Sequence, residues 1–224
     1  MFTVLAVAGT VAVYRAAAWV HARVGWSVLQ PVATTSIAVV GLLLVLRVPA
    51  ATYVKKVEVL SVLLGPSVVA LGVGVEGELP RLRGRAVRVL SAVVAGALVG
   101  VVSAASVARL LGASPVIVAT LAPKSTTSPI AMAIAERTGG LPSLAAAIVV
   151  VVGIVGAIVG PPLLRAAGVR DPYAWGLAMG ASSHGVGTAR AAAEGETEAA
   201  GSALGLALTG VVTSVAVPIV LGWM

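Results

Sequence analysis

One short polar segment inside an apolar stretch carries the residue types that bind small anions. A lysine and four hydroxyl side chains lie between two prolines, in the order Pro123, Lys124, Ser125, Thr126, Thr127, Ser128 and Pro129. Residues 116–122 and 130–135 on either side are apolar, so a single helix would hold Lys124 near the middle of a membrane. A lysine at that depth costs about 2.5–3.5 kcal/mol and usually faces a cavity or a partner. The segment therefore predicts a site for a negatively charged group.

The two prolines predict that a helix is interrupted at this segment. Pro129 disfavours helical geometry at Ser128 but suits the first turn of a new helix, with Ser128 as its cap. The free N–H groups of that helix carry positive partial charge, which together with the Lys124 ammonium suits a small carboxylate. In the alternative, the segment is re-entrant or made of two short pieces, and Lys124 extends towards the membrane surface. A re-entrant loop of this composition would still line a pathway.

A second polar segment, residues 180–190, predicts another wall of the same site. Its glycines, among them Gly185 and Gly187, permit local unwinding of the helix. The side chains expected to contact the bound anion are Ser183, His184, Thr188 and Arg190. A histidine can hydrogen-bond a carboxylate or carry a coupling proton. In the alternative, glycine and serine serve tight helix packing, and His184 bonds a backbone carbonyl.

A third helix break is expected at Gly65 and Pro66, where the proline is again placed to start a half-helix. Similar residues open corresponding segments of the chain, with Gln30-Pro31 in one half and Leu141-Pro142 in the other. These parallels suggest two structural halves, 1–110 and 111–224, each carrying a discontinuous helix, as in many transporters. Inverted halves require an odd number of crossings in each, and the sequence leaves this open.

Composition and length indicate a polytopic, all-helical membrane protein. Of the 224 residues, 59% are hydrophobic and only 10% are charged, well beyond the usage of water-soluble domains. Dividing the chain at charges, Pro and Gly predicts eight segments, with seven as the alternative. They cover residues 2–20, 29–46, 57–75, 87–108, 113–135, 142–164, 172–192 and 199–222. The short connections predict a single membrane domain over 1–224 and leave no room for a soluble enzyme domain.

Several function classes are disfavoured by the charged and reactive residues. The net charge of +7 comes from cations scattered between apolar stretches, which is typical of lipid headgroup anchors rather than of a nucleic-acid surface. There is no cysteine, and the two histidines cannot build a metal site alone. We therefore expect no metal, no cofactor and no enzyme activity, while coupling to H⁺ or Na⁺ stays open.

The order and spacing of several motifs closely resemble the LrgB/CidB family. The matching runs, which extend the likeness over essentially the whole chain, are 64–71, 121–132, 139–143, 160–162 and 176–191. Two departures are noted: the family commonly has Ser-Val-Thr-Thr-Pro where this chain has residues 125–129, and Asn-Pro where it has Gln30-Pro31. Both departures keep polar character, so the site is expected to be retuned rather than lost.

The resemblance implies a multi-pass protein of the bacterial inner membrane. Members are usually encoded beside a smaller LrgA-type partner, are called antiholin-like and are tied to murein hydrolase control and autolysis. Plastid relatives resemble translocators of glycolate and glycerate, and bacterial relatives are linked to pyruvate uptake.

Two functions are therefore predicted. The leading one is a secondary transporter of small monocarboxylates such as pyruvate, glycolate or glycerate, which bind at broken helices near the membrane midplane. The alternative is an antiholin-like membrane subunit that regulates murein hydrolase activity with an LrgA-type partner. The oligomeric state, including a homo-oligomer, is not determined by the sequence.

Overall fold

The computed structural model describes residues 2–25, 29, 31–62 and 84–224. The described residues are all-helical, which confirms the predicted fold class. Two compact units, Met1–Val69 and Ala70–Met224, are each described by themselves. Four helices within the described ranges are long and apolar enough to cross a membrane: Thr3–Val24, Ala86–Leu110, Pro142–Ala166 and Glu196–Gly222. At a rise of about 1.5 Å per residue, helices of 22 to 27 residues are long enough to cross the roughly 30 Å hydrocarbon core of a bilayer.

The first unit contains helices α1 (Phe2–Val24), α2 (Pro31–Val45), α3 (Ala50–Lys56) and α4 (Glu58–Val62). Helices α1 and α2 pack together, and the hydroxyls of Thr10 in α1 and Tyr53 in α3 are hydrogen-bonded at 2.7 Å. The predicted break at Gly65 and Pro66 lies outside the described residues.

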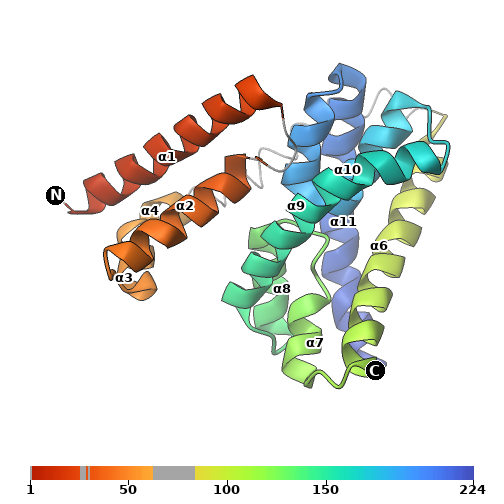
Figure 1. The fold of residues 1–224 in the computed structure, drawn as a ribbon. Coiled ribbons are helices and arrows are strands. Elements are labelled where there is room, and N and C mark those ends of the chain that lie inside the picture. Colours follow the sequence, from red (N-terminus) through yellow and green to blue (C-terminus); the bar gives the residue numbers. More distant parts are fainter. Residues whose placement is uncertain (1, 26–28, 30, 63–83) are drawn as a thin grey trace. The chain divides into compact units, whose positions relative to one another are not determined.

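The second unit holds both polar segments. It consists of α6 (Ala86–Leu110), α7 (Pro115–Leu121), α8 (Ser128–Arg137), α9 (Pro142–Ala166), α10 (Pro172–Ala192) and α11 (Glu196–Gly222). Figure 1 shows the C-terminus beside the end of α6 and the start of α7. Large apolar side chains point outward along the long helices, with Val87 82%, Leu110 85% and Val211 66% exposed. Such a surface suits lipid and would be an aggregation liability in water.

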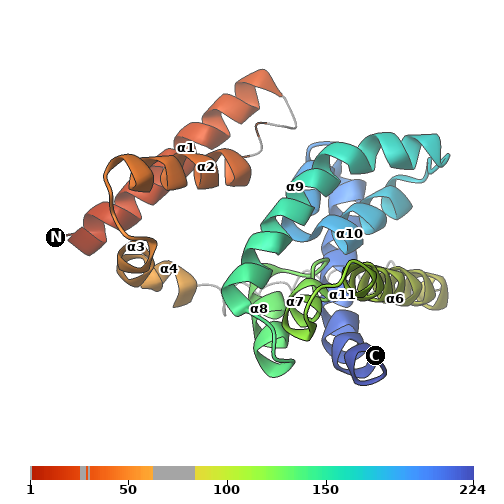
Figure 2. The same cartoon turned by 60° about the horizontal axis from the view of Figure 1, so that its bottom comes forward.

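The predicted fifth segment, 113–135, does not form one helix but the two short helices α7 and α8. They have 7 and 10 residues, or about 10 and 15 Å, too short for either to cross a bilayer. After α8 the chain returns to α7, where the N–H of Leu141 donates to Thr120 Oγ1 at 2.9 Å. Helices α7 and α8 are therefore antiparallel arms of a re-entrant hairpin, which we call the first hairpin (115–137). Figure 2 shows its arms side by side next to α9.

The predicted seventh segment, 172–192, also turns back on itself. His184 has non-helical backbone angles, φ 43° and ψ −135°, which interrupt α10. Beyond this residue Gly187 lies against Met179, and Ala191 packs in one cluster with Trp175 and Met179. The two arms of α10 are thus antiparallel, and we call them the second hairpin (172–192).

The two hairpins enter the second unit from opposite ends. The base of the first hairpin lies near the C-terminal ends of α6 and α11, since Pro115, Thr138 and Met224 line one cavity. The base of the second lies at the start of α11, where Gly176 meets the backbone of Glu198. Each hairpin is followed by a membrane-length helix, α9 or α11, and the two helices run in opposite directions. Residues 115–166 and 172–222 of the second unit thus each form a hairpin followed by a long helix, and the two run in opposite directions.

Candidate functional site

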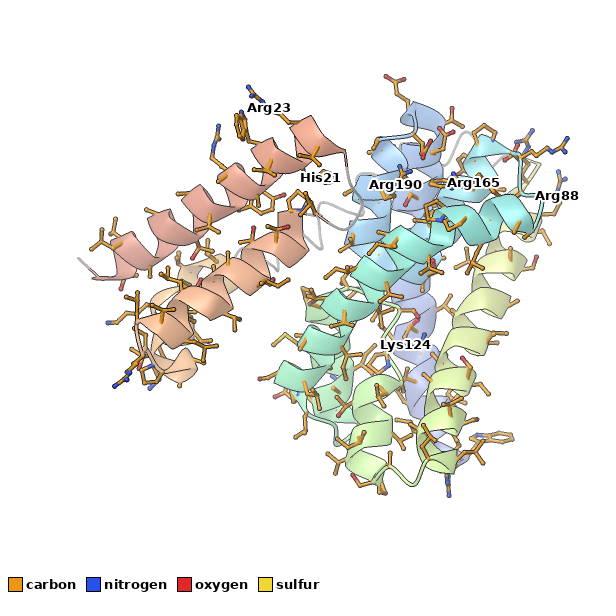
Figure 3. All side chains as sticks on the ribbon, viewed as in Figure 1. His21, Arg23, Arg88, Lys124, Arg165 and Arg190 are labelled. Atoms are coloured by element: carbon orange, nitrogen blue, oxygen red, sulfur yellow. The ribbon has the colours of Figure 1, made fainter. Side chains whose placement is uncertain are left out.

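The tip of the first hairpin lies halfway along the long helices. Gly100 in α6 and Gly210 in α11 lie near the middle of their helices, and both face this tip: a Cβ at Gly100 would be 3.5 Å from Ser125 Oγ, and one at Gly210 would be 3.6 Å from Thr126 Oγ1. The tip, residues 122–127, is not helical. Lys124 therefore lies at mid-depth, and Figure 3 shows it in the middle of the second unit.

A cavity of about 460 Å³ lies between α6 and the two hairpins. Its polar lining comes from Lys124 and Ser125 in the first hairpin and from Ser182 in the second. Its apolar lining consists of Ala92, Val93, Val99, Ala174, Leu177, Ala178 and Ala181, together with Gly96 and Gly100. Hairpins from opposite ends of the unit thus meet at one polar spot of a mostly apolar space.

The Lys124 ammonium has one hydrogen-bond partner, the Ser125 hydroxyl, at 3.1 Å. Among the described residues, no carboxylate forms an ion pair with this lysine. The side chain is half-buried. A partly desolvated cation without a counter-charge attracts anions more strongly than one in water, because the local dielectric constant is lower. The geometry suits a negatively charged group bound in the cavity.

The remaining predicted residues of the first hairpin do not line this cavity. Thr126 is fully buried towards α11. Thr127, rather than the predicted Ser128, is the N-cap of α8, and its side chain makes no capping bond. Ser128 is the first helical residue, because the extended backbone that precedes Pro129 begins one residue earlier than expected. Pro123 is buried within the tip.

The tip of the second hairpin is held by hydrogen bonds. His184 is 5% exposed, and its Nε2 donates to the carbonyl oxygen of Val149 in α9 at 2.7 Å. Thr188 Oγ1 donates to the His184 carbonyl and accepts from Ser202 Oγ in α11, both at 3.0 Å. Ser183 is fully buried and bonds Ser182 Oγ at 3.1 Å. These contacts match the packing alternative for this segment, in which His184 bonds a backbone carbonyl.

Glycine allows the second hairpin to pack tightly. A Cβ at Gly187 would overlap the Met179 carbonyl oxygen, whereas Gly185 has no neighbour within 4 Å of that position. A Cβ at Gly153 or Gly156 of α9 would overlap the side chains of His184 or Ser183. Close approach of helices through small residues is common in membranes.

Arg190 lies away from the cavity. Its guanidinium forms an ion pair with Glu194, one helical turn further along the chain. Figure 3 shows Arg190 near Arg165 at one end of the second unit, well separated from Lys124. The structure therefore brings together Lys124, Ser125 and the second-hairpin tip, but not Arg190.

Of the residues that line the cavity, Lys124 and Ser125 were predicted as site residues, whereas Ser182, Gly96 and Gly100 are among those that were not. Ser182 precedes two predicted residues and lines the cavity from the exposed side of the tip. The spacing of Gly96 and Gly100, four residues apart in an apolar helix, is a known signal for close approach in membranes. It was available in the sequence but does not indicate a ligand.

Fold and site define a class: a polytopic helical membrane protein in which two re-entrant hairpins meet at a cavity. The chain belongs to the LrgB-like family, which it matches over residues 10–223. It is therefore a multi-pass bacterial membrane protein, as predicted.

Similar proteins cover almost the whole chain. It is 31% identical to the uncharacterized protein YwbG of Bacillus subtilis, over 96% of each chain. It is 27% identical to the holin-like protein CidB of Staphylococcus epidermidis, over 97% of this chain and 95% of the relative. It is 30% identical to the antiholin-like protein LrgB of Bacillus mycoides, over 72% and 70%. No solved structure matches the chain.

Proposed function

We propose that this protein is a secondary transporter whose cavity binds small monocarboxylates such as pyruvate, glycolate or glycerate. One observation carries the proposal: hairpins from opposite ends of the second unit line the same mid-depth cavity, which contains a lysine without a carboxylate partner among the described side chains. Broken helices that meet near the midplane are where carriers bind anionic solutes.

Each part of the cavity has a role in this proposal. Lys124 binds the carboxylate, and Ser125 and Ser182 donate hydrogen bonds to the carboxylate or to the neighbouring hydroxyl or keto oxygen. Leu177 and Ala178 contact the carbon chain of the solute. Of the nine solute-binding residues predicted from the sequence, this proposal keeps Lys124 and Ser125, and it adds Ser182. Thr126 and His184 position the tips, and Arg190 lies outside the site.

Access from both membrane faces follows from the opposite entry of the hairpins. A carrier must expose one site alternately to each side. Displacement of the first hairpin would open the cavity towards the C-terminal ends of α6 and α11, and displacement of the second hairpin together with α11 would open it towards the N-terminal end of α6.

Uptake into proteoliposomes tests this function. The purified chain is reconstituted, and entry of radiolabelled pyruvate, glycolate and glycerate is followed with and without an excess of the unlabelled acid. We expect saturable uptake of at least one of them that unlabelled acid inhibits. Empty liposomes and a Lys124→Ala variant serve as controls. Absence of saturable uptake at every pH and ion gradient, or full uptake by Lys124→Ala, would overturn the proposal.

A second function has its own support in the names of the relatives, which favour it over transport. Two of the similar proteins are called holin-like and antiholin-like. In this function the chain is a membrane subunit that assembles with an LrgA-type partner and regulates murein hydrolase activity. It requires no solute, and its outward apolar helices serve as assembly surfaces. Co-purification with such a partner, and a change in autolysis rate that Lys124→Ala does not affect, would favour this function over transport.

A further inference from the structure

Four buried threonine hydroxyls in the second unit have no hydrogen-bond partner among the residues that the structure describes. They belong to Thr126 and Thr127 in the first hairpin tip and to Thr209 and Thr213 in α11. Thr126 and Thr209 are fully buried, and Thr213 is 1% exposed. Nearly all buried polar groups in proteins are paired, so each of these atoms requires an explanation. Nothing in the carboxylate cavity uses them.

Other hydroxyls of the same elements and their neighbours do have partners. Thr120, Thr138 and Ser214 each donate to the backbone carbonyl four residues earlier, at 2.7 to 2.8 Å. Ser214 directly follows Thr213, so the same local bond is available on α11. Thr209 and Thr213 instead leave their oxygens free to bind something else.

The side of α11 that contains Gly210 and Val217 faces the first hairpin tip. Thr126 Oγ1 lies 3.6 Å from a Cβ position at Gly210, which is the neighbour of Thr209 in α11. Thr213 and Val217 are one turn apart on α11, and Val217 packs in one cluster with Ala122 of the tip. Thr213, three residues after Gly210 and four before Val217, therefore lies on the side of α11 that faces the first hairpin, and Thr209 lies one turn before it.

Backbone oxygens at the end of α7 add to this group. The carbonyl of Ala119 lacks its helical donor because Pro123 has no N–H. The carbonyl of Thr120 also lacks its helical donor, because the N–H of Lys124 donates to the carbonyl of Leu121 instead, at 3.1 Å. The C-terminal end of a half-helix carries negative partial charge, and in membrane carriers such ends coordinate cations.

We propose that these hydroxyls, with the free carbonyls at the end of α7, bind a sodium ion. All the available atoms are hard, neutral oxygens, which suit a small cation of low charge. The described residues hold no group of three or more His, Cys, Asp or Glu side chains, so no carboxylate cluster is present there to balance a divalent ion.

The proposed ion and Lys124 lie on the same hairpin tip and repel each other. An anion bound at Lys124 would reduce this repulsion, so sodium and carboxylate should each strengthen binding of the other. This coupling alone rests on the proposed transport function. The sodium site itself does not.

Thermal unfolding of the purified full-length chain in detergent tests the site. Midpoints are compared in NaCl, KCl and choline chloride at equal ionic strength, first without any carboxylate and then with pyruvate, glycolate or glycerate. We expect NaCl to raise the midpoint by several degrees over both other salts, because a ligand that binds only the folded state stabilises it. Thr126→Val and Thr213→Val should lose this sodium-specific rise, while Thr126→Ser, which keeps the hydroxyl, retains it.

Ser214→Ala is the matched control, because it removes a neighbouring hydroxyl that already has a partner. Its sodium-specific rise should equal that of the unchanged chain. Equal midpoints in all three salts, with and without a carboxylate, would overturn the site and leave ordered water as the occupant of the hydroxyl group. A sodium response that pyruvate, glycolate and glycerate all leave unchanged would uphold the site and contradict its coupling to a carboxylate at Lys124.

Discussion

The two hairpins reach the same cavity but are built differently. The first turns through six non-helical residues, 122–127, that carry a lysine and three hydroxyl side chains. The second turns at a single residue, His184, whose side chain is bonded to α9. One tip therefore presents many polar atoms, and the other presents few.

The two hairpins also differ in how their helices pack against their neighbours. The first arm of the second hairpin lies against α11 with interlocking glycines, Gly176 and Gly180 on one side and Gly201 and Gly205 on the other. A Cβ at any of the four would overlap a backbone carbonyl oxygen of the opposite helix. The first hairpin packs through side chains such as Ile130, and the buried hydroxyls of Thr126 and Thr127 at its tip have no partner among the described residues.

This difference suggests that the second hairpin is the more rigid of the two and that the first hairpin carries the binding groups. Contacts between backbones cannot be relieved by a change of rotamer, so the second hairpin and α11 should behave as one body. The first hairpin is fixed by fewer such contacts and contains the groups that a solute or ion could satisfy. We infer that the second hairpin is the scaffold and the first hairpin is the responsive element.

The largest expected effect concerns the opposite entry of the hairpins, and it is all or none. The chain has no cysteine, so single cysteines can be introduced at exposed residues of each base: Ser114, Glu136, Arg170 and Ala193. A membrane-impermeant thiol reagent applied to one side of sealed vesicles should label the first two or the last two, never one of each pair. Labelling of Ser114→Cys and Glu136→Cys from opposite sides would mean that 113–135 spans the membrane.

The next largest expected effect is a difference in uptake between variants of the two tips, Lys124→Ala in the first and Ser182→Ala in the second. Lys124→Ala removes a charged partner of the proposed carboxylate, worth about 1.5–3 kcal/mol, and should lower uptake by roughly 10- to 100-fold. Ser182→Ala removes a neutral hydrogen bond of about 1 kcal/mol and should lower uptake only several-fold. Initial uptake rates in proteoliposomes, normalised to reconstituted protein, measure both. Equal losses would remove the distinction between a binding hairpin and a scaffold hairpin.

The rigidity of the second hairpin predicts a loss of stability rather than of binding. Gly180→Ala adds a methyl group where the Ser202 carbonyl lies, so the helices must separate, at a cost of about 1–3 kcal/mol. Gly185→Ala is the control, because no atom lies within 4 Å of its added carbon. Thermal unfolding in detergent should show a lower midpoint for the first variant only. A similar midpoint for both variants would contradict backbone-close packing.

The smallest expected effect concerns the attachment of the first hairpin to α9. Thr120→Val removes the hydroxyl that accepts from the Leu141 N–H and should destabilise the chain by about 1 kcal/mol. Thr138→Val is the comparison, because the Thr138 hydroxyl bonds only its own helix. The difference between their unfolding midpoints measures the contact. No difference would show that this hydrogen bond does not hold the hairpin.

Sequence patterns located the first tip but not its path. Pro123 and Pro129 mark the interruption, and Lys124 marks the proposed anion site, because both effects are local. The segment is re-entrant if α8 reverses the direction of α7, and it is a broken span if α8 continues that direction. The residue types of the loop between the two helices do not predict which of these occurs. A broken span and a hairpin have the same apolar pattern.

The sequence did not predict the reversal of the second hairpin, for a related reason. Gly185 and Gly187 indicated unwinding, yet the left-handed backbone falls on His184, which is uncommon for residues other than glycine. That conformation is imposed by packing on α9 and the return of the chain, both tertiary effects. Arg190 was grouped with the site because an unbroken helix would place it in one stripe with Ser183 and Gly187, but the reversal of α10 carries it to the outer end.

Val149 of α9 contacts both hairpins. Its side chain packs in one cluster with Ala131 and Ala135 of the first, and its carbonyl accepts the hydrogen bond from His184 of the second. A sideways shift of α9 at this residue would disturb both contacts, so the two entrances to the cavity are mechanically linked. The link offers a physical basis for an interlock in which one entrance closes before the other opens.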